Sequence, residues 1–154
     1  MNNGDFTIKE VETKLQYYCS YQDRCHKEVH QKLKTFNIIP EGVDQIISNL
    51  ISENFLNETR FCESFVRGKF KIKNWGKIRI INELKKRNIS TYNINQGLKE
   101  IDELEYLNKF EEIFNKKLSS LEKLTSLEKK KKILSYLLYR GWESSLIYKK
   151  IYEI

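Results

Sequence analysis

The stretch IINELKKRNISTYNINQGLKEI, residues 80–101, carries the pattern that decides the fold of this 154-residue chain. Ile80 and Leu84 are spaced i,i+4, and such spacing keeps apolar side chains on one face of a helix. Asn88 follows them, and asparagine tolerates the left-handed conformation that ends many helices. Ser90 is a residue type that caps the start of the next helix. The stretch therefore predicts two short helices joined by a tight turn.

The same pattern occurs three times along the chain. Residues 30–50, 81–101 and 134–154 align at offsets of 51 and 53 residues, and six columns are apolar in all three rows. Tandem units of this kind bury their apolar faces against each other, so we expect an elongated array. The columns are Val29/Ile80/Ile133, Leu33/Leu84/Leu137, Ile38/Ile89/Trp142, Val43/Ile94/Ile147, Ile47/Leu98/Ile151 and Leu50/Ile101/Ile154.

In each unit, one residue is suited to end the first of the two paired helices. Asn37, Asn88 and Gly141 occupy equivalent positions, and all three residue types tolerate a positive φ. We expect all three to adopt the left-handed conformation. The following helix starts at Pro40 in the first unit, because proline suits the first helical position, and after the N-cap Ser90 in the second.

A further helix precedes each pair, over about residues 7–20, 58–71 and 103–117. Thr7 and Glu10 form a capping box at the first of these starts. The chain has one proline, and no segment alternates apolar and polar residues for long. The predicted fold is all-α, with three tandem three-helix repeats in an elongated, curved array. The predicted units span residues 1–54, 55–102 (the basic unit) and 103–154.

Composition excludes several classes of protein. No run of about 18 apolar residues exists, so we expect no membrane span. Residues 1–5 lack the pattern of a signal peptide, and we expect a cytoplasmic monomer. The three cysteines are an odd, irregularly spaced set that argues against a disulfide framework. Cys25, His26 and His30 lack a second close ligand pair, so we expect no metal.

Motifs for catalysis are absent from the sequence. There is no P-loop, no dinucleotide glycine pattern, no nucleophile elbow and no HExxH. We therefore expect neither enzymatic activity nor a cofactor.

Basic residues concentrate in the middle of the chain. Residues 59–88 contain ten basic and two acidic residues, a net charge of +8, whereas the whole chain carries +7. Basic surface of this kind attracts phosphate or acidic protein. A solvated helix face with Phe65, Phe70 and Trp75 in the core is the simpler interpretation; we favour it for these aromatic residues but favour binding for the bases. The candidate binding residues are Arg60, Arg67, Lys69, Lys71, Lys73, Lys77, Arg79, Lys85 and Arg87.

Several stretches together resemble the RecX family of bacterial recombination regulators. They are Arg24-Cys-His-Lys-Glu-Val29, Phe55-Leu-Asn-Glu-Thr-Arg-Phe61, Val66-Arg-Gly-Lys-Phe70, Trp75-Gly-Lys-Ile-Arg-Ile80 and Leu137-Leu-Tyr-Arg-Gly-Trp142, and they span nearly the whole chain. Cys25 departs from the family, which often has serine as this N-cap, and so does the pair Asn57-Glu58, where the family has two acidic residues.

The resemblance implies a protein without enzymatic activity that binds along the groove of the RecA–single-stranded DNA filament. Such proteins restrain ATP hydrolysis and strand exchange by RecA. Direct contact with single-stranded or double-stranded DNA stays open. The alternative is a stand-alone helix-turn-helix-like DNA-binding protein, although the predicted helix over residues 91–101 has only Lys99 as a base. An adaptor for another acidic partner is a third interpretation.

Overall fold

The computed structural model describes residues 6–154, which form nine α-helices and no strand within that range. The all-α prediction is therefore confirmed. Residues 1–5, which carried the expectation about a signal peptide, lie outside the described range. The helices are α1 (Ile8–Tyr21), α2 (His26–Leu33), α3 (Pro40–Ser52), α4 (Glu58–Lys71), α5 (Lys77–Lys86), α6 (Thr91–Leu98), α7 (Glu103–Ser119), α8 (Ser126–Tyr139) and α9 (Ser144–Ile151).

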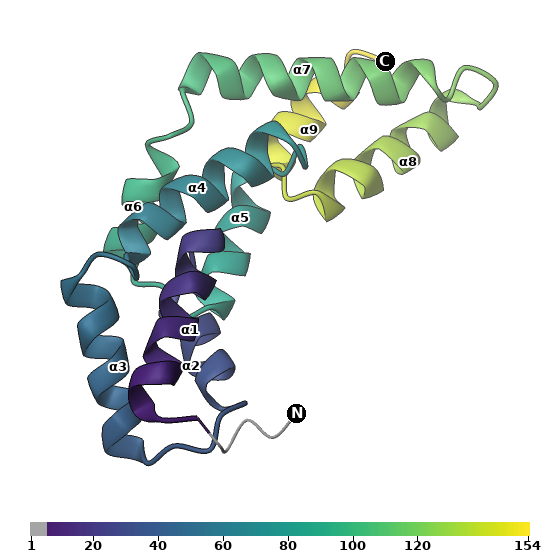
Figure 1. Ribbon diagram of the computed structural model, residues 1–154. Helices are drawn as coiled ribbons and strands as arrows, with labels where there is room; N and C mark the ends of the chain where they lie inside the picture. The colour runs from purple at the N-terminus through teal and green to yellow at the C-terminus, as the bar shows by residue number, and fades with distance from the viewer. Residues whose placement is uncertain (1–5) are drawn as a thin grey trace.

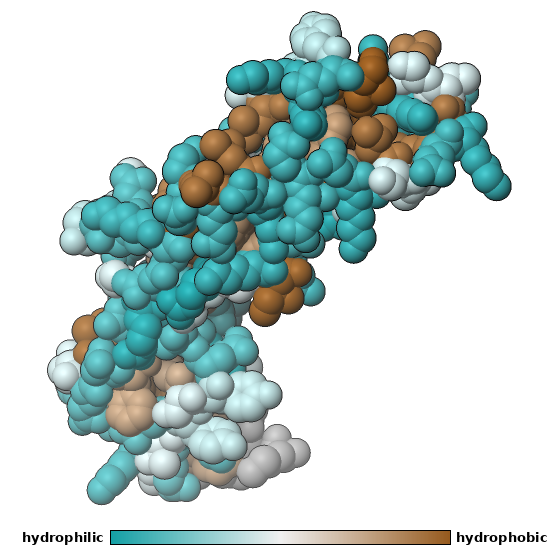
Figure 2. All heavy atoms as spheres, turned by 90° about the horizontal axis from the view of Figure 1, so that it is seen from above, coloured by the Kyte–Doolittle hydropathy of each residue, from teal (hydrophilic) through white to brown (hydrophobic). Residues whose placement is uncertain are grey.

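The molecule is elongated and bent, as the tandem pattern predicts (Figure 1). Helices α1–α3 form one arm, α7 and α8 extend in the other, and α4–α6 lie between them. In the view of Figure 2, hydrophilic side chains cover most of the visible face of this bent rod, interrupted by smaller apolar areas. None of the helices in the described range is long and apolar enough to cross a membrane.

Two hydrophobic clusters divide the molecule unequally. The first holds α1–α3 together, with Val11, Leu15 and Leu50 among its fully buried side chains. The second includes Cys25, which precedes α2, and runs through both later units, from Phe61 in α4 to Ile151 in α9. The first three helices therefore have a core of their own, whereas the last six share one.

Two of the three predicted helix stops are confirmed. Asn88 has φ 59° and Gly141 has φ 89°. The next residue in each case reaches back to close the turn: the Ile89 N–H donates to the Leu84 carbonyl at 3.2 Å, and the Trp142 N–H donates to that of Leu137 at 3.1 Å. These are the bonds of a helix stop with an apolar contact across it.

The prediction for Asn37 is wrong, because its φ is not positive. Helix α2 ends earlier, and the Phe36 N–H donates to the Leu33 carbonyl at 3.0 Å. The Phe36 ring is buried against the first core. The chain therefore turns at Phe36, one residue before Asn37, which is the position that aligns with Asn88 and Gly141. Residues 37–39 then run irregularly to Pro40, and Ile39 adopts the extended conformation required before a proline.

The predicted helix starts are confirmed. The Thr7 hydroxyl accepts from the Glu10 N–H at 3.1 Å, and the Glu10 carboxylate accepts from the Thr7 N–H at 3.3 Å. Pro40 begins α3, and the Ser90 hydroxyl caps α6 by accepting from the Asn93 N–H at 3.2 Å. These local bonds explain why the sequence pattern locates the helices so well.

The third unit is fastened to the turn between α4 and α5. The Gly76 N–H donates to the Arg140 carbonyl at 2.8 Å, and the Trp142 indole N–H donates to the Asn74 carbonyl at 3.1 Å. Gly76 also meets the backbone of Gly141 so closely that a side chain would not fit. Backbone contact and a shared core therefore set the angle between the last two units.

Candidate interface on the basic middle unit

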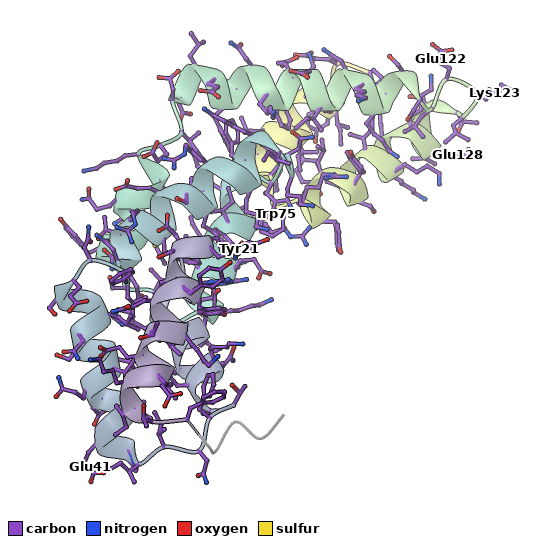
Figure 3. All side chains as sticks on the ribbon, in the orientation of Figure 1. Tyr21, Glu41, Trp75, Glu122, Lys123 and Glu128 are labelled. Atoms are coloured by element: carbon purple, nitrogen blue, oxygen red, sulfur yellow. The ribbon has the colours of Figure 1, made fainter. Side chains whose placement is uncertain are left out.

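The nine predicted binding residues come from α4, α5 and the turns that follow them. In Figure 3, Trp75, which lies in the turn between these two helices, projects toward the inner side of the bend. The structure separates the nine residues into three groups. Some are paired with carboxylates, some are stacked on aromatic rings, and some are free.

Arg60 belongs to the joint between the first and second units. Its Nε donates to Asp23 Oδ1 at 2.7 Å, and its Nη2 donates to the carbonyls of Asn54 at 3.0 Å and Phe55 at 3.2 Å. The Ser64 hydroxyl donates to the other Asp23 oxygen at 2.9 Å. With most of its donors used inside the chain, Arg60 has a structural role in the unbound protein.

Arg67 and Lys77 are also paired with carboxylates. Arg67 Nη1 lies 3.2 Å from Glu100 Oε1, and Lys77 Nζ lies 3.1 Å from Glu103 Oε2. Both acids lie outside the basic window of residues 59–88. The fold therefore places negative charge beside the window, and the effective positive charge of the surface is smaller than the sequence indicates.

Three cations lie over the two partly buried aromatic rings of the middle unit. Lys69 Nζ is 5.3 Å from the centre of the Phe65 ring and 5.0 Å from that of Trp75. The Arg79 guanidinium lies 4.2 Å from the Trp75 ring, and that of Arg87 lies 4.9 Å from Phe65. Such contacts hold cations in place while leaving part of each available to solvent. We call these five residues the cation–aromatic cluster.

The cations of the cation–aromatic cluster lie close enough to affect one another. Burial lowers the pKa of Lys69, and the nearby charges of Lys73 and Arg87 lower it further, although Glu83 opposes them. Arg87 also pairs with Glu83 at 3.2 Å. Because the cations repel one another, a bound anion would be stabilised there.

The free group consists of Lys71, Lys73 and Lys85. All three are exposed, and none has a carboxylate oxygen within 4.0 Å among the described residues. The carbonyls of Lys71 and Lys73 accept hydrogen bonds from the side chains of Lys109 and Arg140. Their backbone is thereby tied to the third unit, although both residues are exposed.

The aromatic residues divide between core and surface. Phe70 is buried, as predicted, whereas Phe65 and Trp75 pack only partly against the core. Gly68 has open space around it, so a partner's backbone has access there. Gly76 does not offer such access, because the chain's own Gly141 occupies the space.

Sequence reasoning missed Tyr139, which lies over the same guanidinium as Trp75. The Arg79 guanidinium is 4.8 Å from the centre of the Tyr139 ring, and its Nη1 donates to the Tyr139 carbonyl at 3.4 Å. The two residues are 60 positions apart. A periodic apolar pattern gives no signal for such a contact, since Tyr139 is largely exposed.

The cysteines and histidines near the joint have ordinary partners. His26 Nδ1 lies 3.2 Å from Glu58 Oε1, and within residues 6–154 no group of three potential ligands could hold a metal ion. Burial raises the pKa of the Cys25 thiol to about 11 and that of Cys62 to about 12. Both thiols therefore stay protonated at neutral pH.

Two family models match this chain over most of its last two units. The model of the second three-helix domain of RecX matches residues 57–98, and that of the third three-helix domain matches residues 104–151. The chain belongs to the RecX family. Both matched ranges lie within all-helical segments of the structure.

Proteins named regulatory protein RecX align with most of this chain. The one from Streptococcus sanguinis is 31% identical over 129 residues, which is 84% of this chain and 49% of the relative. The one from Oceanobacillus iheyensis is 27% identical over 141 residues, covering 92% of this chain and 52% of the relative. The chain thus spans about half the length of these relatives.

Solved RecX structures share the fold. RecX from Lactobacillus salivarius superimposes with a TM-score of 0.81 at 25% identity, and the match covers 95% of this chain and 94% of that one. A second crystal structure of regulatory protein RecX gives a TM-score of 0.83 at 20% identity, over 96% of this chain and 73% of that one. The bent tandem arrangement is therefore one that RecX proteins adopt.

Proposed function

We propose that this protein binds the RecA–single-stranded DNA filament and modulates RecA, mainly by inhibiting ATP hydrolysis and strand exchange. It acts without catalysis of its own. Membership of a family of regulatory proteins supports the general role. The observation that carries the proposal is the set of free cations Lys71, Lys73 and Lys85 in the same unit as the cation–aromatic cluster, on a long, bent molecule.

An elongated shape suits binding along a polymer. A rod can contact several protomers at once, and several weak contacts on one rigid body give avidity that no single contact provides. The free lysines supply attraction to phosphate or carboxylate groups, and this attraction falls as salt rises. If the rod fits one filament conformation better than others, it opposes the changes that accompany ATP turnover.

Charge reversal at the three free lysines tests the proposal. Lys71→Glu, Lys73→Glu and Lys85→Glu together remove attraction without breaking an ion pair of the fold. Arg67 and Lys77 are poorer targets, because their reversal would set them against Glu100 and Glu103. The matched control reverses three other exposed lysines, Lys9, Lys123 and Lys131, with the same change in net charge.

The readout is the DNA-dependent ATPase of preformed RecA filaments titrated with each protein. We expect the wild type and the control to inhibit at similar concentrations. The Lys71/Lys73/Lys85 variant should need roughly tenfold more protein, since each lost contact is worth up to about 1 kcal/mol at a solvated surface. Equal inhibition by the two triple variants would remove the middle unit from the mechanism, and no inhibition by the wild type would refute the function.

The helix-turn-helix alternative makes a different prediction. Helix α6 would be the recognition helix, yet it buries Ile94 and packs Gly97 against Cys62 of α4. Its exposed positions include Tyr92 and Asn95, and the basic Lys99 lies just past its end. Tight, sequence-selective binding to duplex DNA at physiological salt without RecA would favour this alternative.

A further inference from the structure

The first unit carries a groove that the proposed filament contact does not use. It has a volume of about 720 Å³ and lies between α1, the end of α2 and the turn that follows α2. Five aromatic rings line it: Phe6, Tyr17, Tyr18, Tyr21 and Phe36. Its residues lie outside the ranges 57–98 and 104–151 that match the family models. A volume of this size lies in the range of pockets that take small organic ligands.

Two of the rings are largely exposed. Tyr17 and Tyr21 are each 76% exposed, although both are large enough to contribute substantially to a core. They are spaced i,i+4 on α1, so they project from the same side of the helix. In Figure 3, Tyr21 projects from the end of α1 toward the inner side of the bend. Their rings are therefore accessible to a flat ligand.

The separation of the two tyrosines suits such a ligand. Four residues of α-helix advance about 6 Å, and stacked bases lie about 3.4 Å apart. A ring inserted between two others needs about twice that stacking distance. The distance along α1 between Tyr17 and Tyr21 is thus close to the distance needed to hold one base between two rings.

The charge around the groove is positive. Lys14, Arg24 and Lys32 are the charged residues in its lining, and the lining contains no carboxylate. Arg24 is held over the Tyr18 ring at 3.7 Å, with Glu28 3.7 Å away outside the lining. Lys14 lies 4.5 Å from the centre of the Phe6 ring. The arrangement is therefore one of aromatic faces bordered by cations.

We propose that this groove binds unpaired bases of single-stranded nucleic acid. Tyr17 and Tyr21 stack on the bases, and Lys14 and Lys32 contact the phosphates. Proteins that bind single strands combine these two features, because every base has a π-face and every nucleotide a negative charge. An acidic peptide would use the cations but would leave the two exposed tyrosine faces without a partner. The inference requires no RecA and goes beyond the filament contact of the middle unit.

The test measures binding of a fluorescein-labelled oligo-dT strand to the full chain, without RecA, by fluorescence anisotropy. The variant is Tyr17→Ala/Tyr21→Ala. The matched control is Tyr92→Ala/Tyr152→Ala, because these tyrosines are also highly exposed but lie far along the chain. Circular dichroism checks that both variants remain folded, which their exposure makes the expected result. An abasic strand of the same length separates stacking from phosphate attraction.

We expect the Tyr17/Tyr21 variant to bind oligo-dT at least about fivefold more weakly than the wild type, as loss of one stacked base would produce. The control should bind like the wild type, and the wild type should prefer oligo-dT to the abasic strand. The inference is overturned if the two double variants bind alike or if the abasic strand binds as tightly as oligo-dT. Because the binding measurement contains no RecA, failure of this inference would not change what the ATPase test says about the proposed function.

Discussion

Gly141 lies where the last two units meet most closely. Its φ of 89° and the closeness of the Arg79 backbone both exclude a side chain. We expect Gly141→Ala to lower the free energy of unfolding by about 2 kcal/mol or more, since it combines backbone strain with a clash. Urea denaturation followed by circular dichroism measures the loss.

Gly68 provides the matched control for Gly141. It lies within α4, and an added Cβ would meet nothing within 4 Å. Gly68→Ala should therefore stabilise the protein by about 0.5–1 kcal/mol through higher helix propensity. Similar losses in both variants would mean that the close approach at Gly141 does not determine stability.

The cysteines provide a second test at this scale. Cys19, Cys25 and Cys62 are free thiols with buried side chains, and burial raises the pKa of each. Because the thiolate is the reactive form, none should react quickly with a disulfide reagent at pH 8 in the native protein. All three should react promptly in guanidinium chloride. One fast thiol in the native protein would contradict the burial seen here.

At the scale of elements, Tyr106 connects three helices through one hydroxyl. The Lys77 N–H at the start of α5 donates to Tyr106 Oη at 2.9 Å, and the Tyr106 hydroxyl donates to the Glu143 carboxylate before α9 at 2.7 Å. The ring itself is buried against Trp142. Burial raises the pKa of Tyr106, so the hydroxyl keeps its proton and remains a donor.

Removing that hydroxyl should destabilise the protein without changing its helices. We expect Tyr106→Phe to cost about 1–3 kcal/mol, because the Lys77 N–H and the Glu143 carboxylate both lose a partner in a partly buried place. Thermal unfolding measures the cost. Tyr92→Phe, at an exposed position of α6, is the control and should leave the midpoint unchanged. An unchanged midpoint for Tyr106→Phe as well would show that water replaces the hydroxyl at little cost.

At the scale of the whole molecule, the two joints differ in kind. The later units share one apolar core. The first unit has its main core to itself and meets the second through the polar contacts of Asp23 and His26 and through one buried thiol, Cys25, which packs into the later core. Partly solvated polar pairs contribute less stability than a continuous apolar core. The first joint should therefore be the more easily altered of the two.

Asp23→Ala should broaden the distribution of shapes in solution, because it frees Arg60 and Ser64 at this joint. Small-angle scattering would show a changed radius of gyration or a wider distance distribution, while the helix content stays constant. Lys131→Ala, at an exposed residue of α8 in the third unit, should leave the scattering curve as it is. Identical curves for Asp23→Ala and the wild type would mean that these contacts do not set the bend.

Local patterns predicted the helices, because their causes are local. The i,i+4 spacing, the caps at Thr7 and Ser90 and the stops at Asn88 and Gly141 each involve residues a few positions apart. The exception, Asn37, failed because the Phe36 ring entered the core and turned the chain earlier. Repetition of the pattern and the location of the charge were likewise readable from the residues alone.

Whether each cation is paired with a carboxylate or left free was decided by tertiary contacts. Arg60 is occupied by Asp23 and Arg67 by Glu100, over separations of 37 and 33 residues, whereas Lys71 stays free. The aromatic groove of the first unit arises in the same way, since Phe6, Tyr17 and Phe36 meet only once α1 and α2 have packed. Ion pairs and grooves join residues far apart in the chain, and a periodic apolar pattern carries no information about which distant partner each polar side chain meets.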